Sequence, residues 1–227
     1  MARRLATLAL LAALVGCGAA QARPPRVLVV TEARRYVHAS IPAAVAALRR
    51  LGRRDGYRID VVGAAAALTP ARLRGARVVA FVSTTGELRA GPGPLLAWIR
   101  RGGAFLGLHS VTATWRRQRE FHRMLGATFR SHPRAGSGRV VVEDRHDRAT
   151  RGLPRSFAVR DEFYVFARDP RPRVHVLASH RGTPLVWRRS YGRGRVFVDS
   201  LGHFGARWRE RDTQALVGGG LRWLLRR

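Results

Sequence analysis

The chain has 227 residues, of which 46% are hydrophobic and 25% are charged, and this composition excludes an intrinsically disordered protein. Its single cysteine excludes both an intramolecular disulfide and a zinc site built from several cysteines. The formal net charge is +29, and all 43 basic residues are arginines. Because many arginines occur as pairs spread along the chain, we interpret them as solvated surface residues. Non-specific binding to polyanions is expected from this charge in any case.

Residues 1–22 have the pattern of an export signal. A short basic segment precedes an apolar run, Leu5 to Val15, that is too short for a stable membrane-spanning helix. Two cleavage patterns follow. Ala20-Gln21-Ala22 is typical of a secreted protein, whereas Leu14-Val15-Gly16-Cys17 is typical of a bacterial lipobox. Because the lone cysteine lies at the lipobox position, we expect lipidation of Cys17 and a cell-envelope lipoprotein rather than a freely secreted protein.

Strand and helix patterns alternate after a linker at residues 23–25, and we expect one domain over residues 26–227. The expected strands of the first half are apolar runs at residues 26–30, 57–62, 77–82 and 104–108. The expected helices begin at an N-cap Ser40 and end at Gly52, begin at Thr69-Pro70, and cover residues 95–101 and 115–125, the last with His122 solvated. This alternation predicts an α/β fold with a mostly parallel sheet covered by helices on both faces.

The second half is richer in strand patterns. The expected strands cover residues 139–143, 162–166, 174–178, 184–188 and 195–198. Tyr191-Gly192-Arg193-Gly194 predicts a hairpin turn between the last two of them. A final helix is expected to begin at Asp212 or Thr213. The sequence therefore predicts extra strands added to the parallel sheet.

Polar residues follow several of the expected parallel strands. They occupy residues 31–40, 83–87, 107–110 and 200–203 and include histidine, serine, threonine and glutamate. In an open parallel sheet, ligands bind beyond the carboxyl ends of the strands. We therefore expect these four loops to form one binding site.

Six motifs, in order along the chain, resemble the trehalose-utilisation (ThuA-like) family. They are Thr84-Thr85-Gly86-Glu87, the stretch from Gly102 to Ser110, Phe129-Arg130-Ser131-His132-Pro133, Gly152-Leu153-Pro154, Asp161-Glu162-Phe163-Tyr164 and Leu201-Gly202-His203. The resemblance covers residues 27 to 225. It implies a flavodoxin-like fold similar to class I glutamine amidotransferases, and a role in sugar metabolism that includes oxidised (3-keto) sugars.

The resemblance also shows what the chain lacks. Class I glutamine amidotransferases carry a nucleophilic cysteine on a sharp strand-to-helix turn, and His109 stands at that position here. Cys17 lies in the export segment and cannot replace it, so transfer of ammonia from glutamine is not expected. Ser110 is one position away from the turn, which disfavours a serine hydrolase.

The residues that we expect to be catalytic are His109, His203 and Glu162, because imidazole and carboxylate groups transfer protons near neutral pH. The residues that we expect to bind substrate are His38, Thr85, Glu87, Ser110, His132 and Tyr164. The same histidines and glutamate are able to bind a divalent metal such as zinc, although no local motif such as H-E-x-x-H indicates one. No G-x-G-x-x-G motif follows the first strand, so a dinucleotide cofactor is not expected.

Three functions are compatible with these patterns. The first is an exported protein that acts on a carbohydrate by hydrolysis, isomerisation or proton transfer through His109 and His203. The second is a non-catalytic sugar-binding module tethered to the cell envelope. The third is a polyanion-binding envelope protein, which rests on the net charge alone. Product formation distinguishes the first from the second, and salt-dependent binding to polyanions indicates the third.

Overall fold

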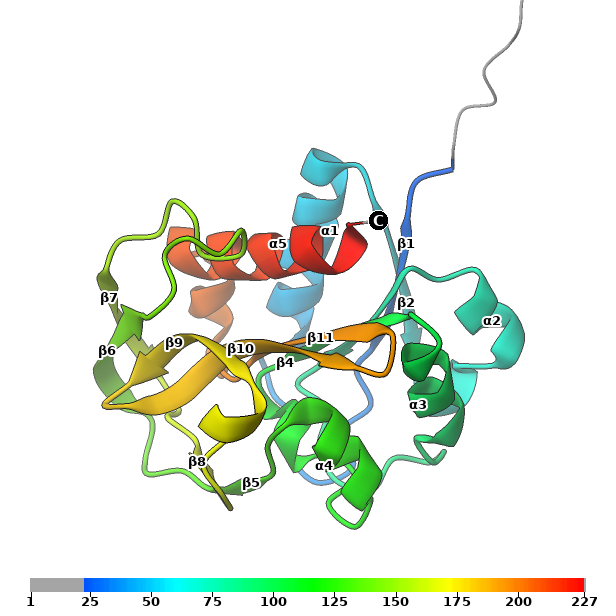
Figure 1. The fold of residues 1–227 in the computed structure, drawn as a ribbon, viewed down its shortest axis with the longest axis horizontal. Helices are drawn as coiled ribbons and strands as arrows, with labels where there is room; N and C mark the ends of the chain where they lie inside the picture. Colours follow the sequence, from blue (N-terminus) through cyan, green and yellow to red (C-terminus); the bar gives the residue numbers. More distant parts are fainter. Residues whose placement is uncertain (1–22, 227) are drawn as a thin grey trace, which may run out of the picture.

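The computed structural model describes residues 23–226, so the export signal, the lipobox and Cys17 lie outside the described residues. A nine-stranded sheet has the order β2-β1-β3-β4-β11-β10-β9-β6-β7 (Figure 1). Its parallel part consists of β1 (Arg26–Val30), β2 (Arg58–Gly63), β3 (Val78–Val82), β4 (Ala104–Leu108) and β11 (Gly194–Asp199). Its antiparallel part adds β6 (Gly136–Val142), β7 (Ser156–Asp161), β9 (His175–His180) and β10 (Thr183–Tyr191). The predicted α/β fold with extra strands is confirmed.

Burial explains the two parts of the sheet. Every residue of β3 and β4 is buried, as expected for central parallel strands covered on both faces. In β6 and β7, by contrast, buried and more accessible residues alternate, because one face of these outer strands is open. Strands of the first half are therefore apolar throughout, whereas those of the second half have an alternating pattern.

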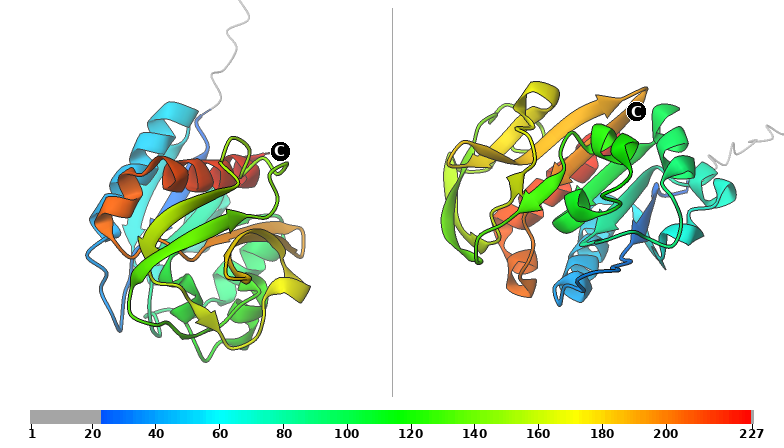
Figure 2. Two further views of the ribbon diagram at one scale, coloured as in Figure 1. Left: turned by 90° about the vertical axis from the view of Figure 1, so that its left-hand side faces the viewer. Right: turned by 90° about the horizontal axis from the view of Figure 1, so that it is seen from below.

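Helices cover both faces of the parallel part (Figures 1 and 2). On one face α1 (Ile41–Asp55) and α5 (Arg211–Leu225) pack in one apolar core that includes Leu48, Leu216 and Phe197. The opposite core includes residues of α2 (Pro70–Arg74), α3 (Gly93–Arg100) and α4 (Arg119–Leu125). Short 3₁₀ helices are η1 (Ala65–Ala67), η2 (Ser110–Ala113), η3 (Arg171–Arg173) and η4 (Gly205–Arg209). Within residues 23–226, none of these helices has the length and apolarity to span a membrane.

The carboxyl-terminal boundary of α1 differs from the prediction. The helix continues past Gly52 to Asp55 and ends at Gly56, whose φ of 76° suits glycine. Gly52 lies inside the helix, where the absence of a side chain admits the Tyr57 carbonyl oxygen, which a Cβ would approach to 2.6 Å. Ser40 has helical backbone angles, and its side chain makes no capping hydrogen bond. The helix therefore begins directly after Ser40, as predicted, but without the side-chain cap.

The predicted helix at residues 115–125 begins only at Arg119. Trp115 has a φ of 47°, which interrupts the helical backbone. His122 is buried, against the prediction, and its ring lies between the carbonyl oxygens of Trp115 and Ala127, at 3.1 and 3.2 Å.

The predicted strand at residues 162–166 was also wrong, and β7 was missed. Only β8 (Val165–Phe166) is extended there, and it pairs with β5 (Phe129–Ser131) in a separate two-stranded sheet. The strand before it ends at Asp161, whose carboxylate accepts a hydrogen bond from the backbone N–H of Glu162 at 2.8 Å. This contact turns the chain out of the sheet at the point where the acidic motif begins.

Three consecutive glycines in α5 allow close packing. A Cβ on Gly219 would lie 2.6 Å from Ala149 Cα, which is rigid backbone. A Cβ on Gly218 would meet only side chains, the nearest being the end of Arg54 at 3.1 Å. The two neighbouring glycines therefore have different tolerances for a methyl group.

We predict that Gly219→Ala lowers the free energy of unfolding by about 1–3 kcal/mol, because the steric clash outweighs the better helix propensity of alanine. Gly218→Ala should leave stability unchanged or raise it by up to about 1 kcal/mol, the gain in helix propensity. Urea unfolding of both variants, compared at equal m values, measures the difference. Equal effects of the two substitutions would contradict this packing.

Candidate metal and substrate site

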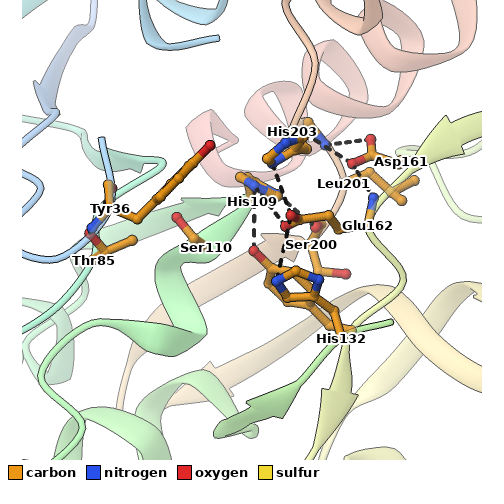
Figure 3. A network of polar contacts seen from close by, with 12 residues as sticks. Tyr36, Thr85, His109, Ser110, His132, Asp161, Glu162, Ser200, Leu201 and His203 are labelled. Carbon is orange, nitrogen blue, oxygen red and sulfur yellow. Dashed lines mark hydrogen bonds and ion pairs between the residues drawn. The ribbon is translucent and has the colours of Figure 1, made fainter. Parts of the chain in front are cut away.

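The carboxyl ends of β3, β4 and β11 carry loops that enclose a cavity of about 510 Å³. The loop after β1 contributes Tyr36 and His38 to its lining, and the segment after β7 contributes Glu162 and Tyr164. Figure 3 shows His109, His132, Glu162 and His203 pointing toward one another. The four predicted loops therefore meet at one cavity, to which the segment after the missed strand β7 also contributes.

His109 lies at the sharp turn between β4 and η2. Its backbone has a φ of 56°, uncommon for a residue with a side chain, and its N–H donates to the Asp199 carbonyl oxygen at 2.7 Å. The ring is fully buried, and Nδ1 lies 3.2 Å from the Ser200 carbonyl oxygen. Because a carbonyl only accepts, Nδ1 carries the proton and Nε2 offers a lone pair toward Glu162 and Tyr164.

The Glu162 carboxylate lies among three imidazoles. Its Oε2 is 3.6 Å from His109 Nε2, and its Oε1 is 3.2 Å from His203 Nδ1 and 3.5 Å from His132 Nε2. His203 Nδ1 nevertheless has no hydrogen-bond partner, so the short distance is not a well-aligned hydrogen bond. His132 Nδ1 lies 2.9 Å from the Pro133 carbonyl oxygen, so this nitrogen carries a proton and Nε2 is the atom that faces the carboxylate.

His203 is placed by a buried carboxylate. The two oxygens of Asp161 accept hydrogen bonds from the backbone N–H groups of Gly202 and His203, at 2.8 and 3.0 Å. Arg207, which is also buried, lies 3.9 Å from Asp161 and is further held by Glu210 and Asp212. Burial raises the pKa of Asp161. The backbone N–H groups of Gly202, His203 and Glu162, together with the charge of Arg207, lower this pKa in part. The loop after β11 is thus tied to the end of β7.

His38 completes the cluster from the first loop. Its ring is buried with its edge toward His109, at a centroid distance of 4.5 Å, and its Nδ1 has no hydrogen-bond partner. Burial, followed by the charge of His203, lowers the pKa of His38 to about 4. Burial, followed by the charge of His38, also holds the pKa of His109 well below its usual value. Both rings are therefore neutral at neutral pH.

The geometry and charge state of this cluster fit a metal ion. One ligand atom each from His38, His109, Glu162 and His203 lies within 4.8 Å of all the others. Neutral imidazoles and a carboxylate are the usual ligands of zinc and related divalent metals. A second group, Asp144, Asp147 and His175, is less suited because its members already form ion pairs with one another or with Arg188.

The predicted substrate-binding residues divide into two sets. Thr85, Ser110, His132 and Tyr164 line the cavity, as does His38. The Thr85 and Ser110 hydroxyls are engaged with backbone groups, Thr85 donating to the Tyr36 carbonyl oxygen at 2.9 Å and Ser110 to that of Thr84 at 3.1 Å. Glu87 is exposed, does not line the cavity, and accepts from the Arg117 backbone N–H at 3.2 Å. Its expected contact with substrate is therefore not supported by its position.

Tyr164 supplies a protonated hydroxyl. The Tyr164 oxygen lies 3.4 Å from His109 Nε2, within hydrogen-bond reach, and its ring is nearly parallel to that of His132. Burial, followed by the nearby carboxylates of Glu162 and Asp161, holds the pKa of Tyr164 well above its usual value. This hydroxyl therefore remains a donor at neutral pH.

Several residues of the cavity were not singled out from the sequence. These are Arg35, Tyr36, Arg116 and Phe129. The side chain of Tyr36 is 56% exposed at the cavity, with its ring 4.6 Å from that of His38. The position of Tyr36 in the first polar loop was the available signal, whereas the two arginines were indistinguishable from the many surface pairs.

The comparisons with known proteins agree with the fold. The ThuA family profile, described as trehalose utilisation, matches residues 26–224. A ThuA-like protein from Bacteroides uniformis is 20% identical, with a TM-score of 0.77 over 92% of this chain and 95% of that one. A ThuA-like protein from Parabacteroides merdae is 18% identical, with a TM-score of 0.76 over 89% of this chain and 90% of that one.

A cytoplasmic protein from Salmonella typhimurium is more distant, at 12% identity and a TM-score of 0.66 over 89% of this chain and all of that one. No curated protein matches the sequence. The structural likenesses concern the fold alone, but the family profile covers almost the whole of the described chain. The chain belongs to the ThuA, or trehalose-utilisation, family.

Proposed function

We propose that this protein binds a divalent metal such as zinc through His38, His109, Glu162 and His203, and that it acts on a carbohydrate, in particular an oxidised 3-keto sugar, in the adjoining cavity. The observation that carries the proposal is the convergence of these four ligand atoms within 4.8 Å. The family's description as trehalose utilisation supports the carbohydrate part.

The internal geometry of the cluster supports a cation. His109 Nε2 directs a lone pair toward Glu162, and the buried Nδ1 of His38 has no partner. Buried polar atoms normally have partners, and lone pairs that face a carboxylate repel it. A positive ion among His38, His109, Glu162 and His203 would remove both penalties at once.

The residues around this position suit chemistry at a sugar carbonyl. A bound divalent metal would polarise a carbonyl or hydroxyl oxygen of the sugar. The Tyr164 hydroxyl keeps its proton and lies beside His109 Nε2. It is therefore placed to donate a hydrogen bond, or the proton itself, to the same sugar oxygen. His132 is about one third exposed and lies beside Glu162, so it is placed to carry a proton between the cavity and solvent.

The cavity also suits a sugar ring in size and lining. Its volume lies in the range of small-molecule sites. Tyr36 and Phe129 provide aromatic surface on its wall, against which the apolar face of a sugar can pack. At the turn after β4, His109 replaces the cysteine required for glutamine amidotransfer, and the chain's only cysteine lies outside the described residues.

We predict that the metal-loaded protein contains about one ion per chain, and that His109→Ala and His203→Ala each weaken metal affinity by at least about 10–100-fold, the loss that follows removal of a group that merely supports a ligand. The matched control is His146→Ala, because His146 is exposed and outside both histidine-carboxylate groups. Elemental analysis and competition with a chelator measure the effect, and circular dichroism checks the fold. Folded alanine variants that retain the ion would contradict this ligand set.

We predict further that the metal-loaded protein binds 3-keto-trehalose and converts it, whereas His109→Ala forms no product. Tyr36→Ala should weaken sugar binding severalfold and leave the metal content unchanged, because its ring lines the wall without being a ligand. Calorimetry measures binding, and mass spectrometry detects product. Binding without conversion would instead favour the sugar-binding module, and the absence of binding to trehalose, to 3-keto-trehalose and to a panel of other sugars would overturn the proposal.

We also propose that the protein is exported and anchored by a lipid on Cys17. The support is the basic and apolar pattern of residues 1–22 with the cysteine at the end of the lipobox. Cys17→Ser should move the protein from the membrane fraction to the soluble fraction of cells that express the full chain. Mass spectrometry of the wild-type N-terminus should find a lipidated cysteine, and an intact N-terminus would contradict export.

A further inference from the structure

A second concave surface lies beside α4 and is lined by arginine. We call it the arginine groove and define it by Arg116, Arg119, Arg123, Arg168 and Arg173. Arg116 precedes α4, and Arg119 and Arg123 belong to this helix. Arg168 and Arg173 follow β8, so the groove is built from two separate segments whose elements are labelled in Figure 1. The groove has a volume of about 300 Å³, and none of its other lining residues is acidic.

The charges of the groove are poorly compensated. Arg123 pairs with Glu120 at 2.8 Å, and Glu120 is also held by Arg100 and Tyr191. Among the residues that the structure describes, the other four arginines of the groove form no ion pair. Like charges gathered around one hollow repel one another and create a positive potential there, which attracts anions. This convergence distinguishes the groove from arginines scattered on a convex surface.

The buried base of the groove adds a second observation. His122 lines it, and both of its ring nitrogens face carbonyl oxygens, those of Ala127 and Trp115. A neutral imidazole donates from only one nitrogen, so one carbonyl of the pair is left facing a lone pair. An anion in the groove would favour the imidazolium, which donates to both carbonyls.

The groove is linked to the candidate site through Arg116, which lines both hollows. Arg35 adds a second guanidinium to the wall of the site cavity. Guanidinium groups bind carboxylate, sulfate and phosphate with paired hydrogen bonds. A sugar in the cavity that carries an acidic group on its neighbouring ring would thus meet arginines on that side.

We propose that the site prefers an anionic saccharide to a neutral one, with the reacting ring in the site cavity and the carboxylate, sulfate or phosphate in the arginine groove. This substrate class rests on the proposed function, but anion binding in the groove does not. Anion binding in the groove is therefore tested with inorganic sulfate, and the substrate class is tested with pairs of acidic and neutral sugars.

The first experiment titrates the full protein with inorganic sulfate at constant ionic strength. Arg119→Ser with Arg168→Ser should weaken sulfate binding by about tenfold or more, because charge-assisted hydrogen bonds are lost. The control, Arg49→Ser with Arg53→Ser, changes the net charge equally at two exposed arginines of α1 and should have less than about a twofold effect, because neither residue lines the groove. Equal losses of sulfate affinity in the two double variants would indicate general charge attraction and would overturn the proposal that the groove binds anions.

The second experiment compares acidic disaccharides with their neutral counterparts, for example cellobiouronic acid with cellobiose. The acidic member of at least one pair should bind about tenfold more tightly, and the groove variant should abolish that preference. Equal binding of acidic and neutral members throughout would overturn the substrate class. Sulfate binding that persists in His109→Ala, together with loss of metal, would separate the groove from the metal site. Tighter binding to duplex DNA than to every acidic sugar would favour a polyanion-binding protein and overturn the proposal.

Discussion

The carboxylate of Asp161 joins the two halves of the molecule. It ends the outer strand β7 and accepts backbone hydrogen bonds from Glu162, from Gly202 and from His203. The first of these residues belongs to the antiparallel part of the chain, and the other two follow the last parallel strand. This single group therefore brings Glu162 and His203 to the same place, and buried Arg207 compensates its charge. This contact ties Glu162 directly to the loop that carries His203.

The parallel strands supply the remaining histidines, at a cost in backbone strain. His109 and Ser83 both have positive φ angles, and they follow the neighbouring strands β4 and β3. Such angles persist only where the surrounding structure fixes them, and they are concentrated at functional sites. Burial then keeps His38 and His109 neutral, which is the state in which imidazole binds a metal. The strained backbone of His109, the buried rings of His38 and His109 and the four converging ligand atoms therefore all lie in the same small region.

The positive charge of the chain has two components. Most arginines lie on the surface, where charge promotes solubility and non-specific attraction. Those of the arginine groove differ because the fold gathers them around a hollow next to the candidate site. The net charge describes the first component, and only the three-dimensional arrangement defines the second.

The sequence by itself determined the parallel half of the fold and two of the site histidines. Runs such as Val78–Val82 are apolar throughout, and polar loops follow strands at positions fixed by topology, so His109 and His203 were predictable. Tertiary structure decided what depends on contacts distant in the chain. It buried His122, left Glu87 outside the cavity, ended β7 at Asp161 and placed His38 among the ligand atoms. Local patterns record which face of a segment is apolar, but they do not record which loops meet.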